Sequence, residues 1–319
     1  MTAVGGFIAA RLAEPNKPLT VAYETAMKTR VFGPMGMTDT TASFDEGRKG
    51  NVAIPHSDVA DKPWAEPQVL PFTMESFVVP LAPAGAVFST AHDMARYALV
   101  ELAEGKTPEG KEVVSSANLL ERRKPRVKSS AHASYGLGLL VAKRSGVGVV
   151  THDGGTFGFV ARLFLVPEKK IGLVMLMSST ASGRELADAV TQRLFELMLG
   201  AKERAQSDLE HEVELAKAEA KKAQDKMTQA WPEGLAARVT GTWQTDRLGK
   251  LVIAPDPKDA KVLRADAGEW RSRLGYGKGD DGVERLYLLD PPLAGFALRI
   301  DGSDLVIDYG QDVFRFAKK

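Results

Sequence analysis

Residues 149–160 read VVTHDGGTFGFV, and this stretch decides how the first part of the chain folds. An apolar run leads into His152, Asp153, Gly154 and Gly155, and a second apolar run follows shortly afterwards. Two interpretations are open at this point. The four residues either form a plain turn between two strands, or their backbone must come close to something that is not protein, for which glycine is suited because it has no side chain.

The surrounding sequence indicates a β-sheet. Residues 135–178 contain the strand-like runs YGLGLLVAK, FVARLFLVP and KIGLVMLMSS, with VGVVTH as a short fourth run. The connections are short and rich in glycine, which favours antiparallel pairing. A helical pattern over about 183–199 follows the sheet and ends at Gly200.

The chain before the sheet is expected to be helical at its start and irregular in its middle. Residues 3–14 and 19–32 read as helices separated by prolines, and FGPMGMTDT after them reads as a loop because of its glycines and proline. The segment 42–82 contains five prolines, and a loop of that length inside a compact domain is usually functional.

One further helix is marked by its ends. Thr90 and Asp93 fit a capping box, with Met94, Tyr97, Ala98 and Leu102 following at helical spacing before Gly105 ends the helix. Capping accounts for Ser89 and Thr90 without assigning either hydroxyl a chemical role.

The last part of the chain reads as a linker followed by a small β-domain. Residues 201–230 form a charged, alanine-rich helical pattern. Seven short strand-like runs with turn signals follow, which is typical of a small sandwich or barrel: GTWQT, GKLVIAP, KVLRA, ERLYLLD, GFALRI, DLVIDYG and VFRFA. We expect Trp231, Trp243 and Trp270 to fill its core.

Composition excludes several classes of function. The 319 residues carry a formal net charge of +1, which provides no electrostatic footprint for nucleic acid or an anionic membrane. The chain contains no cysteine, which excludes disulfides, a thiol nucleophile and a cysteine-ligated zinc, and is compatible with any compartment. No apolar stretch reaches the 18 or more residues of a membrane span.

Three stretches together resemble the serine β-lactamase and penicillin-binding-protein family, in its class C, esterase and D-peptidase branches. VFGPMGMTDT is similar to the family's "P-L-G-M-x-x-T" segment, and PAGAVFSTAHDMARY to its "P-A-G-G-x-x-S-T-x-x-D-x-A-R-F" helix entry. THDGGTFGF resembles the strand and turn that carry the third active-site motif, which is His-x-Gly in some members. Residues 236–319 resemble the lipocalin-like β-domain that is appended to many of these proteins.

The resemblance implies an α+β fold in three regions. Residues 1–200 would be the C-terminal part of a β-lactamase-like domain, an antiparallel sheet with helices. Residues 201–235 would be a charged helical linker, and residues 236–319 the small all-β domain. The combination of His-x-Gly with a C-terminal β-domain is closer to the D-aminopeptidase and esterase branches than to true β-lactamases. Full-length relatives are commonly periplasmic or secreted, while the location of this chain stays open.

The resemblance also implies acyl transfer. In the family, a serine in Ser-x-x-Lys attacks a carbonyl, and a tyrosine in Tyr-x-Asn helps to move protons. By the third motif, His152 would hold the first position, where it could bind a substrate carboxylate or assist proton transfer, and Gly154 the third. Gly155 would donate its backbone N–H to the oxyanion hole, and such a donor can contribute roughly 3 kcal/mol in the transition state.

The other two motifs are not found in the sequence. No serine is followed by lysine three residues later, and no tyrosine by asparagine two residues later. Ser89 meets His92, for example, and Tyr135 meets Leu137. We therefore expect a truncated or degenerate hydrolase that binds a small acyl or peptide substrate when a missing N-terminal segment completes it, and that is inactive alone. The alternative is a non-catalytic module that binds a peptide or a partner.

A missing first segment would also leave strand edges exposed, so poor solubility or rescue by that segment is expected. The remaining histidines give weaker signals. His56 lies in the long loop and is more often incidental than a substrate contact, and His92 is expected at the surface of a helix. His132 and His211 have no ligand spacing for zinc, so we assign no metal and no cofactor. Asp153 cannot form a dyad with His152, because neighbouring strand side chains point to opposite faces.

Overall fold

The computed structural model describes residues 2–62, 67–180 and 183–319, which form two compact units. Unit 1 consists of Met1–Pro55 and Pro71–Ala205, and unit 2 of His56–Leu70 and Gln206–Lys319. Residues 56–70 thus group with the second unit, although they lie within the region 1–200 that the sequence assigns to the first domain. Among the described residues, no helix has both the length and the apolar character needed to cross a bilayer.

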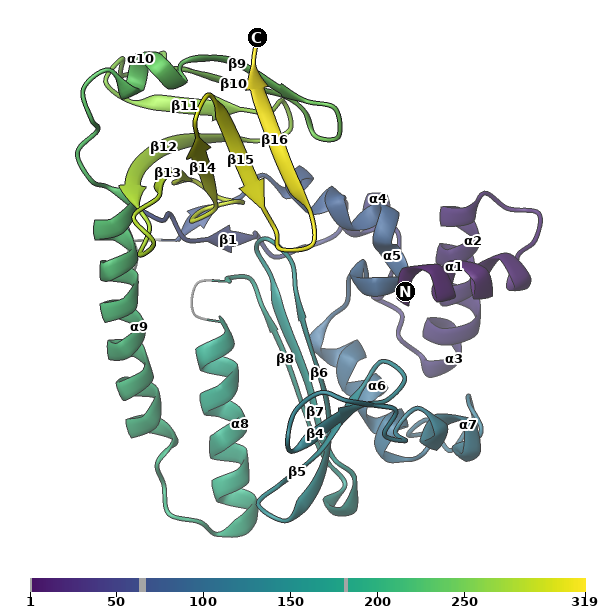
Figure 1. Cartoon of the computed structure of the whole chain (residues 1–319). Helices are drawn as coiled ribbons and strands as arrows, with labels where there is room; N and C mark the ends of the chain where they lie inside the picture. Colours follow the sequence, from purple (N-terminus) through teal and green to yellow (C-terminus); the bar gives the residue numbers. More distant parts are fainter. Residues whose placement is uncertain (1, 63–66, 181–182) are drawn as a thin grey trace. The chain divides into compact units, whose positions relative to one another are not determined.

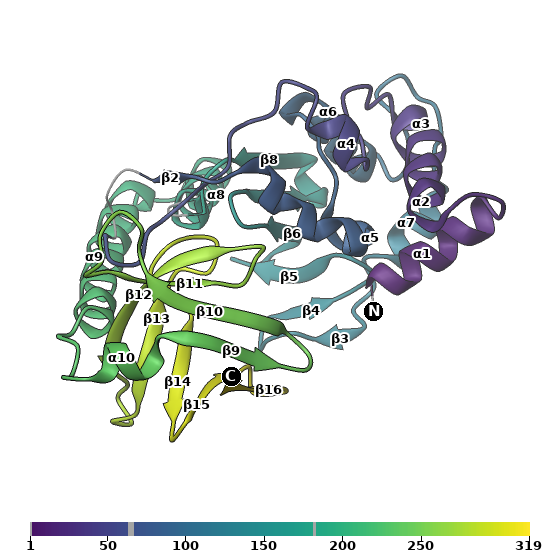
Figure 2. The ribbon, with the colours of Figure 1, turned by 90° about the horizontal axis from the view of Figure 1, so that it is seen from above.

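Unit 1 is built on a six-stranded sheet. Its antiparallel pairing is as the sequence predicts, whereas β3 lies outside the predicted runs. Its strands follow one another in chain order and lie side by side (Figure 2): β3 (Val127–Lys128), β4 (Ala133–Tyr135), β5 (Leu140–Arg144), β6 (Val147–Gly155), β7 (Val160–Val166) and β8 (Ile171–Met177). The predicted run 135–143 is split into β4 and β5, because Gly138 turns the chain with a φ of 78°. Within the described residues β3 and β8 are the outermost strands.

Helices cover both faces of this sheet (Figure 1). On one face Ala98 of α6 (Ala91–Leu102) packs with Val150 and its neighbours. On the other face Phe195 of α8 (Gly183–Leu199) packs with Val149 and Phe164. Because side chains alternate along β6, its even-numbered positions near Val150 face α6 and its odd-numbered positions near Val149 face α8.

The second helical segment ends later than expected. The segments are α1 (Thr2–Ala13), α2 (Leu19–Met27), the π-helical turn η1 (Lys28–Phe32) and α3 (Gly33–Met35). The prediction that Gly33 and Pro34 begin a loop is wrong, because Pro34 lies in the first turn of α3, where its missing N–H is tolerated. The helical segment ends instead at Gly36, which has a φ of 71°.

The segment expected to be a long loop has short regular elements. They are α4 (Phe44–Gly47), β1 (His56–Ser57), β2 (Gln68–Val69), the 3-10 helix η2 (Phe72–Leu81) and α5 (Ala82–Gly85). Two further elements of unit 1 were not anticipated: α7 (Ser116–Glu121) and the 3-10 turn η3 (Pro167–Lys169).

Unit 2 contains a closed eight-stranded antiparallel barrel, which decides between the two predicted β architectures. Its strands are β9 (Gly241–Thr245), β10 (Gly249–Pro255), β11 (Leu263–Asp266), β12 (Arg271–Lys278), β13 (Glu284–Leu288), β14 (Ala297–Asp301), β15 (Asp304–Asp308) and β16 (Val313–Lys318). Pairing of β16 with β9 closes the barrel. Helices α9 (Ala205–Met227) and α10 (Leu235–Val239) precede it.

The sequence analysis missed strand β12, whose run RSRLGYGK is interrupted by glycines. Those glycines are needed because the end of α9 lies against the strand. A Cβ atom at Gly277 would be 1.6 Å from the carbonyl oxygen of Lys226, and one at Gly275 would be 2.2 Å from that of Met227. Glycine within a strand therefore marks the close approach of another backbone here.

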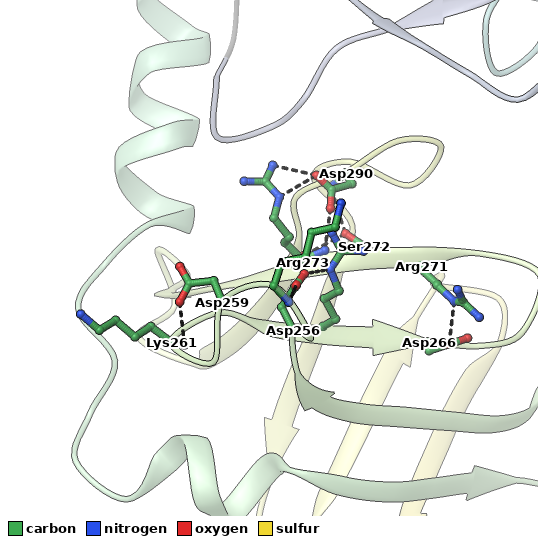
Figure 3. Close-up of polar contacts among 10 residues, drawn as sticks. Asp256, Asp259, Lys261, Asp266, Arg271, Ser272, Arg273 and Asp290 are labelled. Carbon is green, nitrogen blue, oxygen red and sulfur yellow. Dashed lines mark hydrogen bonds and ion pairs between the residues drawn. The ribbon is translucent and has the colours of Figure 1, made fainter.

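The barrel interior is apolar and holds the expected tryptophans. Trp243 is 3% exposed within the core, and Trp231 and Trp270 are partly buried against it. Beside the core, Arg273 donates to Asp290 at 2.7 Å, and the amide of Asp290 donates to Ser272 (Figure 3). Arg273 also donates to Asp61 at 2.9 Å. The two carboxylates raise the pKa of the Arg273 guanidinium against the opposing effect of burial. This network fixes Asp61 to the barrel.

Candidate functional site

Strand β6 carries the three residues that the sequence places in the site. Residues 152–155 are part of the strand and pair with Leu163 to Val160 of β7, while the turn is formed by Thr156–Phe159. The simple interpretation of His-Asp-Gly-Gly as a turn is therefore wrong. Pairing of β6 with β5 ends at Thr151 and Leu140, so residues 152–155 extend beyond β5.

His152 is exposed on the face of the sheet that α6 covers further along the strand. Its Nε2 lies 2.9 Å from the hydroxyl of Tyr135, and the two rings meet edge to face with centroids 5.9 Å apart. Tyr135 lies at the end of β4, in register with Leu140 and through it with Thr151. The sheet thus brings together two proton-carrying side chains that are separated by 17 residues.

Asp153 lies on the opposite face, which confirms that it does not form a dyad with His152. Both of its carboxylate oxygens accept from Arg162, at 2.8 Å and 2.7 Å. Arg162 also donates to Asp188 of α8 at 2.6 Å. Because these two carboxylates surround it, the pKa of the Arg162 guanidinium is raised. Asp153 therefore ties the strand to α8.

Gly154 and Gly155 leave the end of the strand open, and both are exposed. Neither has a positive φ, so the backbone conformation alone does not require glycine. A Cβ atom at Gly154 would make an ordinary contact of 3.6 Å with Ala161, and one at Gly155 would lie 3.2 Å from Nη2 of Arg184. A side chain would therefore fit at Gly154, whereas one at Gly155 would require Arg184 to shift.

The direction of the Gly155 amide follows from the hydrogen-bond ladder. The amide of Thr156 donates to the carbonyl of Phe159 across the turn at 3.0 Å. Along an antiparallel strand, every second amide points to the neighbouring strand. The amides of Gly154 and Thr156 therefore point to β7, and the amide of Gly155 points away from it. The Gly155 N–H is therefore directed to the side where β6 extends beyond β5.

Glu75 holds the turn that follows Gly155. It is 3% exposed in η2, and its Oε1 accepts from the amide of Gly158 at 2.8 Å. Burial raises the pKa of this carboxyl, while hydrogen bonds from Thr156 and from the amides of Gly158 and Phe157 oppose the shift. Phe77 packs on Phe157 with ring centroids 4.2 Å apart, which fixes the same turn.

Sequence reasoning missed Tyr135 and Glu75 as members of this site. No asparagine follows Tyr135 two residues later, so the tyrosine matches no motif, and its partner His152 comes from another strand. A signal for Glu75 was present, because it is the one acidic residue of the otherwise apolar or neutral run FTMESFVVPL. A charge in such a run predicts a buried hydrogen-bonded carboxylate.

The other residues considered in the sequence, at the start of α6, have structural roles. Thr90 caps α6 by accepting from the amide of Asp93 at 3.1 Å, as predicted. Asp93 does not complete the capping box, because its Oδ2 accepts from the amide of Asp39 and the hydroxyl of Thr40. Ser89 is not a cap, and its hydroxyl lies 2.8 Å from that of Thr40. These contacts join the two segments that resemble family motifs.

Two of the other histidines lie in positions that the structure describes. His92 has a 79% exposed side chain, which confirms its surface position. His56 pairs with Val69 between β1 and β2 of unit 2. Within residues 2–62, 67–180 and 183–319, no three metal-ligating side chains come together.

Comparison with known proteins identifies the family. The Beta-lactamase family model matches residues 4–197, which is more than half of the chain. "Penicillin-binding protein 4" of Amycolatopsis lactamdurans is 25% identical over 184 residues, covering 55% of this chain and 46% of that protein. The chain thus spans about half the length of the curated relative that it matches.

Two solved structures align with most of this chain. The crystal structure of SurE aligns with a TM-score of 0.49 and 19% identity, covering 98% of this chain and 67% of that one. The octameric penicillin-binding protein homologue from Pyrococcus abyssi aligns with a TM-score of 0.46 and 18% identity, covering 92% and 59%. The family match and the sheet with its two helical layers agree, and the chain belongs to the Beta-lactamase family, with an eight-stranded barrel at its C-terminal end.

Proposed function

We propose that this chain supplies the substrate-binding strand and the oxyanion donor of a serine hydrolase that cleaves amides or esters through an acyl-enzyme. The observation that carries the proposal is the end of β6, where the Gly155 amide points away from β7 beside two residues without side chains. An amide fixed in this way can stabilise the negative oxygen that develops when a carbonyl is attacked. The family implies peptide or acyl substrates.

In this proposal His152 and Tyr135 form a hydrogen-bonded pair beside the substrate. His152 would bind a substrate carboxylate or pass a proton, and Tyr135 would orient the imidazole. Glu75 acts through the turn rather than on the substrate. No residue of the sequence fits the Ser-x-x-Lys nucleophile, so the 319 residues alone would bind substrate without turning it over.

The test measures substrate binding to the chain by amide NMR. A D-alanyl peptide amide and an aryl acetate are titrated into the ¹⁵N-labelled protein. The proposal predicts saturable shifts at Gly154, Gly155 and His152 with no product released. Gly154→Ala tests access, because its side chain fits but narrows the open strand end. Gly5→Ala, the same change in α1 where an added Cβ meets nothing within 4 Å, is the matched control.

Two outcomes would refute the proposal. Shifts confined to other parts of the chain would show that β6 does not bind these substrates. Saturable binding of peptides at β6 that does not depend on an acyl carbonyl, compared with a reduced analogue, would favour the alternative, a peptide-binding module.

A further inference from the structure

One outer strand of the sheet in unit 1, β8, has an open edge. In the sheet order β8 lies at the opposite end from β3 (Figure 2), and among the described residues its only strand partner is β7. Side chains of α6 and α8 pack against β8 on its two faces. Every residue of β8 nevertheless keeps part of its surface exposed, whereas five of the seven residues of β7 are buried. The exposure of β8 is therefore through its edge.

This edge has none of the features that usually keep an outer strand from pairing with another chain. Such features are charged side chains, proline, a bulge or a very short strand. Residues 171–177 read IGLVMLM, without a charge or a proline, and they pair with β7 in continuous register. At the other end of the sheet, β3 is two residues long and includes Lys128. Of the two outer strands, β8 is the one suited to accept a further strand.

The direction of the backbone groups on β8 follows from the hydrogen-bond ladder. Gly154 and Ala161 exchange hydrogen bonds between β6 and β7, so the even-numbered residues of β7 bond to β8. The register pairs those residues with the odd-numbered residues of β8. The even-numbered residues of β8 therefore point their N–H and C=O groups out of the sheet: Gly172, Val174 and Leu176.

An antiparallel second copy of β8 satisfies all of these outward groups. When Val174 of one copy lies opposite Val174 of the other, Gly172 of each copy lies opposite Leu176 of the other, and each outward N–H meets a carbonyl. The same register sets the hairpin residues 168–170 (Glu-Lys-Lys) of one copy against the neutral residues 178–180 (Ser-Ser-Thr) of the other. Like charges therefore do not face each other, as they would in a parallel arrangement.

We propose that β8 pairs with β8 of a second copy of this chain, in a two-fold symmetric antiparallel dimer with Val174 at the axis. A second copy has the length, the absence of charge and the register that this edge requires. Pairing replaces bonds from the outward groups to water by strand hydrogen bonds, and it removes the side chain of Leu176, now 42% exposed, from solvent. The sheet of one copy then continues into that of the other. The dimer does not depend on the function proposed for β6.

Sedimentation velocity of the full chain tests the proposal. The concentration is varied from about 1 µM to about 1 mM, the range that reports weak association. The expected result is a reversible change from monomer to dimer. Leu176→Pro removes an outward N–H and none that bonds to β7, a position at which an edge strand tolerates proline, and it should weaken the dimer at least tenfold. Leu176→Ala keeps the N–H and is the matched control for the lost side chain, with an expected weakening of about threefold or less.

Hydrogen exchange of the native chain locates the interface without any substitution. The amides of Val174 and Leu176 should exchange at least tenfold more slowly at the high concentration than at the low one. The amides of Leu173 and Met175 bond to β7 and should be equally protected at both concentrations, which makes them the internal control.

Three results would overturn the proposal. The first is a native chain that stays monomeric, or forms only irreversible aggregates, over the whole concentration range. The second is a dimer in which the amides of Val174 and Leu176 exchange as fast as in the monomer. The third is a folded Leu176→Pro variant that dimerises as well as Leu176→Ala.

Discussion

The hydroxyl of Tyr135 lies 2.9 Å from Nε2 of His152, and this contact joins strands β4 and β6 at the open end of the sheet. Replacing Tyr135 with Phe removes the contact while keeping the ring that packs edge to face on the imidazole. We expect a change in the tautomer ratio of His152, because the bond to Nε2 selects which ring nitrogen carries the proton. Long-range ¹H–¹⁵N NMR of the imidazole measures this ratio.

Stability provides the control for the Tyr135→Phe variant. The hydrogen bond is exposed, so its loss should change the free energy of unfolding by less than about 1 kcal/mol. An unchanged tautomer ratio would show that the tyrosine does not orient the histidine.

Hydrogen exchange should distinguish the two glycines of β6. Gly154 points its amide to β7 and should exchange slowly, whereas Gly155 points its amide away from β7 and should exchange orders of magnitude faster. Thr156 is an internal control, since its amide donates across the turn to Phe159. Slow exchange at Gly155 would mean that this amide is already bonded and is not an oxyanion donor.

Replacing the buried Glu75 with Gln should stabilise the protein at neutral pH. Burial raises the folded-state pKa of Glu75, so the folded protein holds this carboxylate in its charged form at a free-energy cost above that pKa. The amide oxygen of Gln can still accept from Gly158 without the charge. The expected result is a higher free energy of unfolding for the variant than for the native chain at pH 8, measured by denaturant unfolding.

The difference in the free energy of unfolding between Glu75→Gln and the native chain should depend on pH. As the pH falls through the folded pKa, the native protein takes up the proton before the unfolded chain does, so its disadvantage shrinks. The difference in the free energy of unfolding should be smallest at and below the ordinary pKa of a glutamate. A variant whose stability advantage over the native chain shrinks as the pH rises would contradict this account.

Because α9 and β12 are in close contact, adding one methyl group to β12 should lower the stability of the protein strongly. In Gly277→Ala the added Cβ would meet the carbonyl oxygen of Lys226 at 1.6 Å, so the backbone of α9 or β12 must move. We expect a loss of about 3 kcal/mol or more in the free energy of unfolding, measured by urea denaturation. Gly154→Ala, whose Cβ would meet Ala161 at 3.6 Å, should change it by less than about 1 kcal/mol. Equal effects of the two substitutions would refute the close approach.

Much of the fold could be predicted because periodicity and turn residues act locally. The runs that became β6, β7 and β8 are apolar and separated by short connections, and Thr90 marks the start of α6 by its own hydrogen bond. Strand β12 could not be predicted in this way. Its glycines are required by the close approach of the α9 backbone, which is distant in sequence. Local pattern carries no information on such an approach.

The candidate site was predictable only where it lies within one motif. His152, Gly154 and Gly155 are adjacent in sequence, and their assignment came from the resemblance to the family. Tyr135 and Glu75 reach the same place through strand register and through the packing of η2 on the β6–β7 turn. Such contacts depend on the tertiary structure, and no fixed spacing in the sequence indicates them.

Covalent labelling tests the central claim most directly. The purified 319-residue chain is incubated with an alkyl fluorophosphonate and, separately, with a chromogenic cephalosporin, and its intact mass is measured alongside turnover. The account predicts no adduct on any serine and no turnover, because the chain offers an oxyanion donor at Gly155 without an activated hydroxyl. A stoichiometric adduct on one serine, abolished together with turnover when that serine is replaced by alanine, would contradict it.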